Sequence, residues 1–517
     1  MQVNGVLTTY GTQAASAIQI NGLGGKDVLR VYGSSLNDTA ILSPSTIRLT
    51  SPIYEVTSTS TEVISVYGGA GHDRVDFFDS AGADTFDAAG SVAWMSTIGQ
   101  SNGVTGFEQI NAHSTSGSDR AFLRGTDAQD FYVGEGRSGT MYSVGYVNRV
   151  NGFARIDAVA DGSGGDQAKI YDTPGNDLVV TQGDRGWMSS AGALNVATGF
   201  DRVEFFSQWG NNDLAAIYDT AAHDIFDTSP DGTRAFIYAA GYMNIATGFS
   251  RVDVYSQNGG QDEAHFRATP GADRYEGRST RAWMVGPGFL NVVNGFATTT
   301  GYSNGQSIDV ALLYGNSGND QFIGQPTFGI AKLIGGNYRH TATGFAQVDA
   351  FAGTGGNDRA FLYDTSGNDV FTSLGATSSM TGSGYQYTVH GFSRADAFAT
   401  SGHDTALLTG RSGIADILES NGNRAWLQSD LFLSVTNDFT LVSSVGQTED
   451  RVLLRNVGGA DQLTGSGSQV KLIRGGGGTE LRGDRFGRVT AESAAGQLPT
   501  ANVSGIDYVF EQVGTWL

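Results

Sequence analysis

Pairs of aspartates 11 residues apart recur along this chain, each in a turn rich in glycine and asparagine. Asp358 and Asp369 form one such pair in the stretch NDRAFLYDTSGNDVF. Carboxylates that converge with backbone carbonyls would bind Ca²⁺, which takes six to eight oxygen ligands. Alternatively, each carboxylate accepts hydrogen bonds from turn N–H groups, as in Asx-turns, and binds no metal. The candidate calcium ligands are Asp73, Asp84, Asp166, Asp177, Asp358 and Asp369.

A second pattern is Arg-x-acid-x-aromatic, whose alternate residues share one face if the segment is a strand. Columns of arginine beside columns of carboxylate avoid like-charge repulsion, so one interpretation is a salt-bridged ladder that fixes the strand register. The other is a carbohydrate platform, with rings stacked on sugar faces and charged groups bonded to hydroxyl or uronate groups. The candidate carbohydrate-binding residues are Arg202, Glu204, Phe206, Arg251, Asp253, Tyr255, Asp349, Phe351, Arg394, Asp396, Phe398 and Trp426. A second aromatic column fits both interpretations: Tyr171, Tyr218, Tyr314 and Tyr363.

An enzyme built on these repeats needs a place where the pattern breaks, because one active site requires a unique set of residues. The pattern breaks at 295–309, which loses the Arg-x-Asp pair, and at 411–439, which gains charged residues. A glycosidase would use two carboxylates, and a polysaccharide lyase would use a base with a charge neutraliser. The second break has an alternative explanation, because repeats near the end of an array normally depart from the common pattern and form a terminal cap. The catalytic candidates there are Glu419, Arg424 and Asp430.

All of these residues belong to a tandem repeat of about 47 residues. The first aspartate of each pair recurs every 46 to 49 residues from Asp27 to Asp450, and the second follows 11 residues later in nine of the ten copies. A Gly-Phe dipeptide recurs in phase with both. Three landmarks in phase over ten copies predict one repetitive fold. The phenylalanines of the dipeptide are Phe107, Phe153, Phe200, Phe249, Phe296, Phe345 and Phe392.

Each copy reads as short β-strands, because apolar residues alternate and Gly/Asn/Asp turns separate them. Val203, Val252 and Val348 are predicted to face the core. We predict an all-β, right-handed parallel β-helix (β-solenoid), because a solenoid accepts any number of repeats. The alternative is a large β-propeller, although ten blades exceed the usual number. The expected organisation is one solenoid over 1–517: a cap or cut edge at 1–26, regular repeats at 27–410, an irregular repeat at 411–449, and a final repeat with its cap at 450–517.

The composition limits the possible functions. The chain has 517 residues, a formal net charge of −21 and no cysteine. So acidic a surface repels phosphate backbones, which argues against nucleic-acid binding. No apolar run is long enough to predict a membrane span, and the N-terminal residues do not form a signal peptide. A fragment of a longer precursor would expose strand edges at its cut ends, which predicts end-to-end self-association.

The stretch GGNDRAFLYDTSGNDVF, with its continuation to GHDTALL, resembles the tandem units of very large secreted and surface proteins of planctomycete-type bacteria. The resemblance extends from about Asp27 to Phe510 and implies an extracellular or cell-surface location. The segment GGAGHDRVDFF (68–78) is also similar to the calcium-binding RTX motif. RTX motifs recur every nine residues, however, and these corners do not, so a calcium β-roll does not carry over.

The sequence thus predicts a structural or adhesive extracellular repeat protein with a rigid acidic surface that binds calcium or glycans. A polysaccharide or cell-surface glycan is the expected partner. The alternative is a polysaccharide-active enzyme, a lyase or glycoside hydrolase, acting in a groove along the solenoid.

Overall fold

The computed structural model describes residues 2–3, 6–7, 16–160, 164–209, 212–305 and 308–517. Part of the expected N-terminal cap and residues 306–307 of the first repeat break therefore lie outside the described residues. The chain forms two compact units. The first contains Met1–Phe226 and Thr233–Gln261, and the second contains Asp227–Gly232 and Asp262–Leu517.

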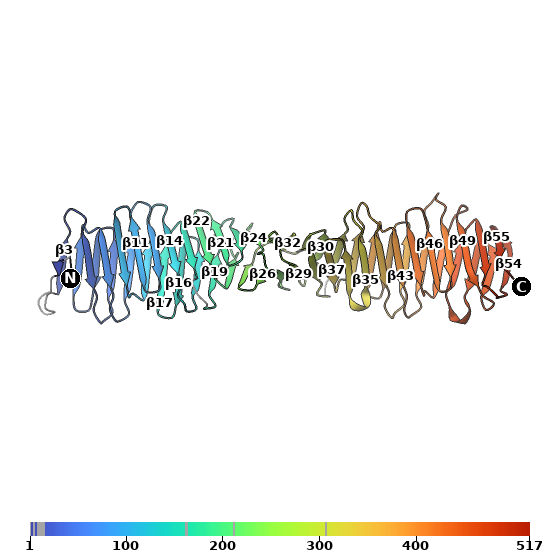
Figure 1. Ribbon diagram of the computed structural model, residues 1–517, viewed down its shortest axis with the longest axis horizontal. Helices are drawn as coiled ribbons and strands as arrows, with labels where there is room; N and C mark the ends of the chain where they lie inside the picture. The colour runs from blue at the N-terminus through green and yellow to red at the C-terminus, as the bar shows by residue number, and fades with distance from the viewer. Residues whose placement is uncertain (1, 4–5, 8–15, 161–163, 210–211, 306–307) are drawn as a thin grey trace. The chain divides into compact units, whose positions relative to one another are not determined.

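Each unit consists of two sheets, A and B, whose strands lie side by side (Figure 1). In the first unit the strands of sheet A follow one another in the order β2 (Val6–Leu7), β1 (Gln2–Val3), β4 (Val28–Tyr32), β8 (Val63–Tyr67), β12 (Gln100–Thr105), β11 (Val92–Thr97), β10 (Thr85–Ala89), β14 (Arg120–Arg124), β18 (Arg155–Val159), β22 (Ala193–Thr198), β21 (Arg185–Ser190), β20 (Leu178–Gln182), β24 (Leu214–Tyr218) and β28 (Arg251–Tyr255).

Sheet B of the first unit has the order β3 (Ala17–Asn21), β7 (Glu55–Thr59), β6 (Thr46–Thr50), β5 (Thr39–Ser43), β9 (Arg74–Phe78), β13 (Gln109–His113), β17 (Tyr146–Asn151), β16 (Ser138–Ser143), β15 (Phe131–Glu135), β19 (Gln167–Tyr171), β23 (Arg202–Phe206), β27 (Tyr242–Thr247) and β26 (Arg234–Ala239). Along the chain, β25 (Ile225–Thr228) lies where the two units divide.

In the second unit, sheet A has the order β32 (Phe289–Asn294), β31 (Arg281–Gly286), β30 (Arg274–Arg278), β34 (Val310–Tyr314), β38 (Gln347–Phe351), β42 (Tyr385–His390), β41 (Thr377–Gly382), β40 (Val370–Leu374), β44 (Thr405–Thr409), β48 (Leu441–Val445), β52 (Glu480–Asp484), β51 (Gln469–Ile473), β50 (Gln462–Gly467) and β54 (Thr500–Ile506).

Sheet B of the second unit has the order β29 (Glu263–Arg267), β33 (Thr298–Tyr302), β37 (Arg339–Thr343), β36 (Ile330–Ile334), β35 (Gln321–Gln325), β39 (Arg359–Tyr363), β43 (Arg394–Phe398), β47 (Leu433–Asn437), β46 (Arg424–Gln428), β45 (Ile417–Asn421), β49 (Arg451–Val457), β53 (Arg488–Ser493) and β55 (Val509–Val513). The described helices are two short 3-10 turns, η1 (Pro326–Phe328) and η2 (Gly475–Gly477), so none is long and apolar enough to cross a membrane.

The stacked strands confirm the predicted all-β solenoid and exclude the propeller. Successive passes of the chain pair in parallel, for example β4 with β8 and β9 with β13. The sequence did not predict that three strands of each copy form an antiparallel meander. The meander of β10, β11 and β12 lies in sheet A, and the next one, of β15, β16 and β17, lies in sheet B. Because successive meanders alternate between the sheets, two sequence repeats make one structural repeat.

The core forms where the alternating apolar residues of the two sheets face each other. Val203, Val252 and Val348 are at most 2% exposed, which confirms their predicted orientation. The phenylalanines of the Gly-Phe dipeptide are at most 5% exposed. Each preceding glycine has a φ of 76° to 88°, a left-handed conformation that costs a residue with a Cβ about 1–2 kcal/mol. The dipeptide is therefore the corner at which each meander returns to the other sheet.

The irregular repeat keeps this corner although it lacks the dipeptide. Asp438 has a φ of 62°, and the following Phe439 is 1% exposed. β45, β46 and β47 still form an antiparallel meander. Asp438–Phe439 thus takes the place of Gly-Phe, since aspartate is one of the few residues that tolerate the left-handed conformation.

Replacing Gly391 with alanine should lower the free energy of unfolding by about 1–2 kcal/mol, because the residue must keep a φ of 76°. Gly336→Ala is the matched control, since Gly336 has no positive φ and no atom within 4 Å of an added Cβ. Urea unfolding followed by circular dichroism measures both. Equal losses in the two variants would contradict this account of the corner.

One buried polar position differs between copies. Asn148, Asn195 and Asn244 each donate a hydrogen bond to a glycine carbonyl in an earlier meander. His340 occupies this position in its own copy and contacts the Thr299 hydroxyl through Nδ1 at 2.7 Å. His340 is buried, and a backbone hydrogen bond to Ser279 only partly opposes the effect of burial. Burial lowers the pKa of His340 to about 4.

Because the unfolded chain binds a proton at His340 near pH 6.5 and the folded chain only near pH 4, the free energy of unfolding should fall across that window as pH decreases. The loss should reach roughly 3 kcal/mol at the acid end. His340→Asn, which restores the residue of the other copies, should remove this slope relative to wild type, as measured by urea titrations at several pH values. An unchanged slope in His340→Asn would rule out the assignment.

Candidate functional site

The corner aspartates bind backbone amides of the neighbouring copy. In eight pairs of described residues, the N–H of the second aspartate donates a hydrogen bond to the carboxylate of the first aspartate in the next copy, at 2.7–2.9 Å. The second aspartate accepts in turn from the backbone N–H a few residues before it, as Thr365 donates to Asp369 at 2.9 Å. The donor and acceptor pairs are Asp38 and Asp73, Asp84 and Asp119, Asp130 and Asp166, Asp177 and Asp213, Asp273 and Asp309, Asp320 and Asp358, Asp369 and Asp404, and Asp416 and Asp450.

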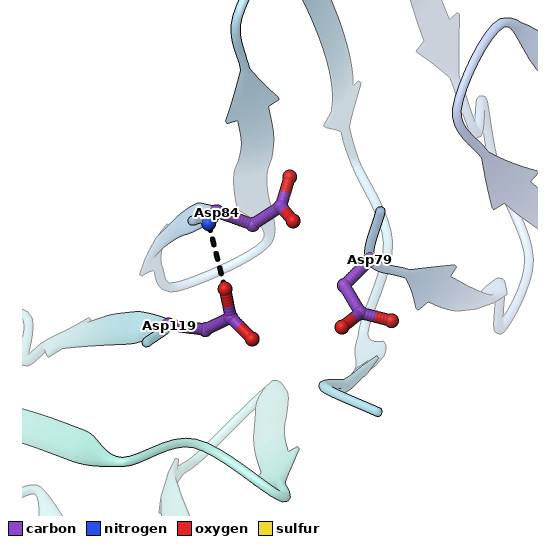
Figure 2. A group of neighbouring side chains, drawn as sticks. All are labelled: Asp79, Asp84 and Asp119. Atoms are coloured by element: carbon purple, nitrogen blue, oxygen red, sulfur yellow. Dashed lines mark hydrogen bonds between the residues drawn. The ribbon is translucent and has the colours of Figure 1, made fainter. Parts of the chain in front are cut away.

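Two groups of three aspartates have carboxylate oxygens within 4.8 Å of one another. They are Asp79, Asp84 and Asp119 in the first unit (Figure 2), and Asp364, Asp369 and Asp404 in the second. Buried aspartate clusters of this kind could hold a metal ion such as Ca²⁺. Of the predicted calcium ligands, Asp84 and Asp369 belong to these groups. Within the described part of the chain, the other four belong to no such group: Asp73, Asp166, Asp177 and Asp358.

The third member of each group was missed at the sequence level. Asp79 and Asp364 lie five residues before the second aspartate of the pair, in the stretches FFDSAGAD and LYDTSGND. Two further copies also have aspartate there, Asp172 and Asp219, whereas four copies have glycine or alanine, for example Gly315. The presence of an aspartate at this position in only certain copies was the sequence signal that could have predicted these groups.

These extra aspartates also have protein donors. Asp364 accepts from the N–H of Thr400 at 2.6 Å and from its hydroxyl at 2.8 Å. Asp404 is 2% exposed, and burial together with the charges of Asp364 and Asp369 raises its pKa. Protonation or a bound cation would relieve this repulsion.

A tyrosine completes the corner in several copies. The Tyr338 hydroxyl donates to Asp320 at 2.6 Å, and Tyr385 donates to Asp369 at 2.9 Å. Burial and the neighbouring carboxylate raise the pKa of Tyr385, so its hydroxyl stays a donor. Phe289 occupies this place in one copy, and the Oδ1 atom of Asp273 there is buried without a hydrogen-bond partner. Asp416, in the copy that carries Phe432, has the same unpaired oxygen.

The Arg-x-acid pattern forms the predicted ion pairs. The arginine-to-carboxylate distances are 3.0 Å for Arg202–Glu204, 2.9 Å for Arg251–Asp253 and 2.7 Å for Arg394–Asp396. Asp349 lacks an arginine at this position and accepts from Gln347 at 3.2 Å. The acidic partners of the three arginines are buried.

The two predicted aromatic columns merge into stacks. Tyr171 lies on Phe206 with ring centroids 4.6 Å apart, Tyr218 on Tyr255 at 5.0 Å, Tyr314 on Phe351 at 4.7 Å, and Tyr363 on Phe398 at 4.9 Å. Each ring therefore covers one face of its neighbour. The ends of a stack can be covered as well, since the Arg278 guanidinium lies 4.0 Å from the Tyr314 centroid and the His390 ring lies on Phe351 at 4.6 Å. The arrangement supports a register-fixing ladder more directly than a sugar platform.

The catalytic candidates of the irregular repeat have separate partners. Glu419 pairs with Arg455, Asp430 with Arg411 at 3.1 Å, and the Arg424 guanidinium lies 5.6 Å from the centroid of the Trp426 ring. Within the described part of this repeat no hydrogen bond or ion pair joins any two of Glu419, Arg424 and Asp430. Each of the three therefore has its contact outside the group.

A scan against protein-family models gives no match, and a search of curated proteins likewise finds none that matches this chain.

Phe289→Tyr should raise the free energy of unfolding by about 1 kcal/mol, because the new hydroxyl would donate to the unpaired oxygen of Asp273. The ring already has the required position: a Cβ on Gly286 would lie 1.7 Å from that oxygen and 2.4 Å from the Phe289 ring. A Cβ on Gly382 meets Asp369 and Tyr385 at 1.7 and 2.5 Å.

The reverse change, Tyr385→Phe, should lower the free energy of unfolding by about 1–2 kcal/mol, since it leaves Asp369 short of a donor. Urea unfolding of both variants beside wild type gives the comparison. A destabilised Phe289→Tyr protein together with a neutral Tyr385→Phe protein would refute the tyrosine–aspartate account.

Proposed function

We propose that this chain is a structural segment of an extracellular or cell-surface protein, a stiff acidic spacer rather than an enzyme. One observation carries the proposal: the polar and aromatic residues that recur along the repeat bind each other or the backbone. Corner carboxylates accept amide hydrogens, arginines pair with the acid two residues away, and aromatic rings stack across neighbouring strands. A location outside the cell rests on the resemblance to large secreted repeat proteins.

The combined replacement of Arg202, Glu204 and Phe206 by alanine tests this proposal. We expect a lower unfolding midpoint in urea, because an ion pair and a ring stack are lost, with no change in retention on a panel of immobilised polysaccharides. Arg30→Ala is the control, since Arg30 is an exposed strand residue that makes no ion pair with any described residue. Glycan binding by wild type that the triple variant loses would instead establish the carbohydrate platform. Release of reducing sugar or of 235-nm-absorbing product would establish an enzyme.

Calcium binding at the two three-aspartate groups is the second candidate, favoured by the closeness of their buried carboxylates. An ion held there would neutralise like charges and stabilise the folded state by linkage. The residues that would hold it are Asp79, Asp84 and Asp119 in one group, and Asp364, Asp369 and Asp404 in the other.

Calcium in excess over a chelator should then raise the melting temperature of wild type by several degrees, and Asp79→Asn with Asp364→Asn should abolish the shift. Asp358→Asn is the matched control. Its copy pairs Asp320 with Asp358 but has Gly315 in place of the third aspartate, so its response to calcium should persist. Identical melting in calcium and in chelator would eliminate this candidate.

A further inference from the structure

The first unit contains a third break in the repeat, on the outer face of β13, β16 and β17 (Figure 1 labels β16 and β17). Where other copies have Arg-x-acid-x-aromatic, β13 has Gln109, Asn111 and His113. In β16, Thr140 occupies the position of Trp94, Trp187 and Trp283 in other meanders.

The loss of the tryptophan leaves a hollow. Trp187 lies opposite Val196 and Trp283 opposite Val292, and both valines are buried. Thr140 lies instead opposite Arg149, which is exposed. The resulting depression has a volume of about 180 Å³ and is lined by polar groups of Asn111, His113, Ser138, Thr140, Arg149 and Asn151.

The charge of this hollow is opposite to that of the whole chain. Its lining contains an arginine and a histidine but no carboxylate. Arg149 makes no ion pair with any residue that the structure describes, whereas Arg202, Arg251 and Arg394 are each paired with an acid. A guanidinium without a partner in a polar recess is a donor for a ligand carboxylate.

Asp76 is the acid that contacts two lining residues, Asn111 and His113, and it already has an arginine partner outside the hollow. Asp76 accepts from Arg74 at 3.1 Å and from the Asn111 side chain at 2.8 Å, and its Oδ1 atom lies 3.7 Å from His113 Nε2. Glu135 lies opposite Ser138 in the strand register but does not line the hollow.

The walls of the hollow also suit a sugar. The His113 ring stacks on Phe78 at 5.0 Å. Tyr142, two residues beyond Thr140, stacks on Phe131 at 5.4 Å and is 39% exposed. Tyr142 does not line the hollow, so the His113 ring is the aromatic surface that the lining offers to the apolar face of a pyranose, and the amide and hydroxyl groups match its hydroxyls.

From these features we infer that the hollow at Asn111, His113, Thr140 and Arg149 is a binding subsite for a sugar carboxylate, as carried by a uronic acid. Arg149 binds the carboxylate, the amide and hydroxyl groups bind ring hydroxyls, and the size of the recess admits one sugar residue. The subsite exists once in the described repeats of the first unit, because no other meander there combines an unpaired arginine with the loss of the large middle-strand residue.

Titration of the full chain with galacturonate, glucuronate, oligogalacturonate and neutral galactose, followed by NMR or calorimetry, tests the inference. We expect wild type to bind the carboxylate sugars at least about tenfold more tightly than galactose, and added salt to weaken that binding. Tighter binding of the oligomer than of the monomer identifies a polysaccharide as the source of the carboxylate. Equal binding of the two identifies a free sugar acid.

Arg149→Val should abolish the preference for carboxylate sugars, and Val is the residue that other copies accept at this position. Thr140→Trp should abolish all binding by filling the hollow as Trp187 and Trp283 do in their copies. If the valine variant fails to fold, Arg149→Gln replaces it. Arg30→Gln is the control: Arg30 is distant in sequence from the residues that line the hollow, so this variant should bind as wild type does. The inference is overturned if wild type shows no preference for carboxylate sugars, or if the Arg149 and Thr140 variants bind as wild type does.

Discussion

The hydrogen bond from a corner amide to a buried carboxylate of the next copy is the interaction on which the rest of this structure depends. A charged acceptor makes each such bond worth about 1.5–3 kcal/mol, and losing the acceptor would leave a buried N–H unsatisfied. The bond joins one copy to the next at the same corner each time. It therefore fixes the register in which the strands stack, and it places the ion pairs and ring stacks of the outer face in line.

The corner also explains why acidic residues are tolerated in such numbers. Each carboxylate sits among N–H and hydroxyl donors, which compensate its burial. The compensation is incomplete where carboxylates crowd, and burial accordingly raises the pKa of Asp73, Asp166, Asp358 and Asp404. A chain with a net charge of −21 can thus fold around its aspartates, since the backbone itself is their main counterpart.

Much of this was predictable because the repeat amplifies local signals. Period-2 patterning predicted that Val203 faces the core and that Arg202 pairs with Glu204. The 47-residue spacing predicted the solenoid. The alternation of meanders between the two sheets was not predictable, because the sequence repeat is the same in both sheets. The third aspartates and the hollow at Arg149 were missed for the opposite reason. They depend on residues that only some copies carry, and their significance appears only when strands distant in sequence pair.

Amide hydrogen exchange at Asp177 tests the corner interaction most directly. Its N–H donates to Asp213 at 2.7 Å, so wild type should show slow exchange there. Asp213→Ala should accelerate exchange at Asp177 roughly 30-fold, which corresponds to the loss of about 2 kcal/mol of hydrogen-bond free energy. The Asp369 amide, which donates to Asp404 in the second unit, should exchange as slowly as before. Fast exchange at Asp177 in wild type, or an unchanged rate in Asp213→Ala, would contradict the account.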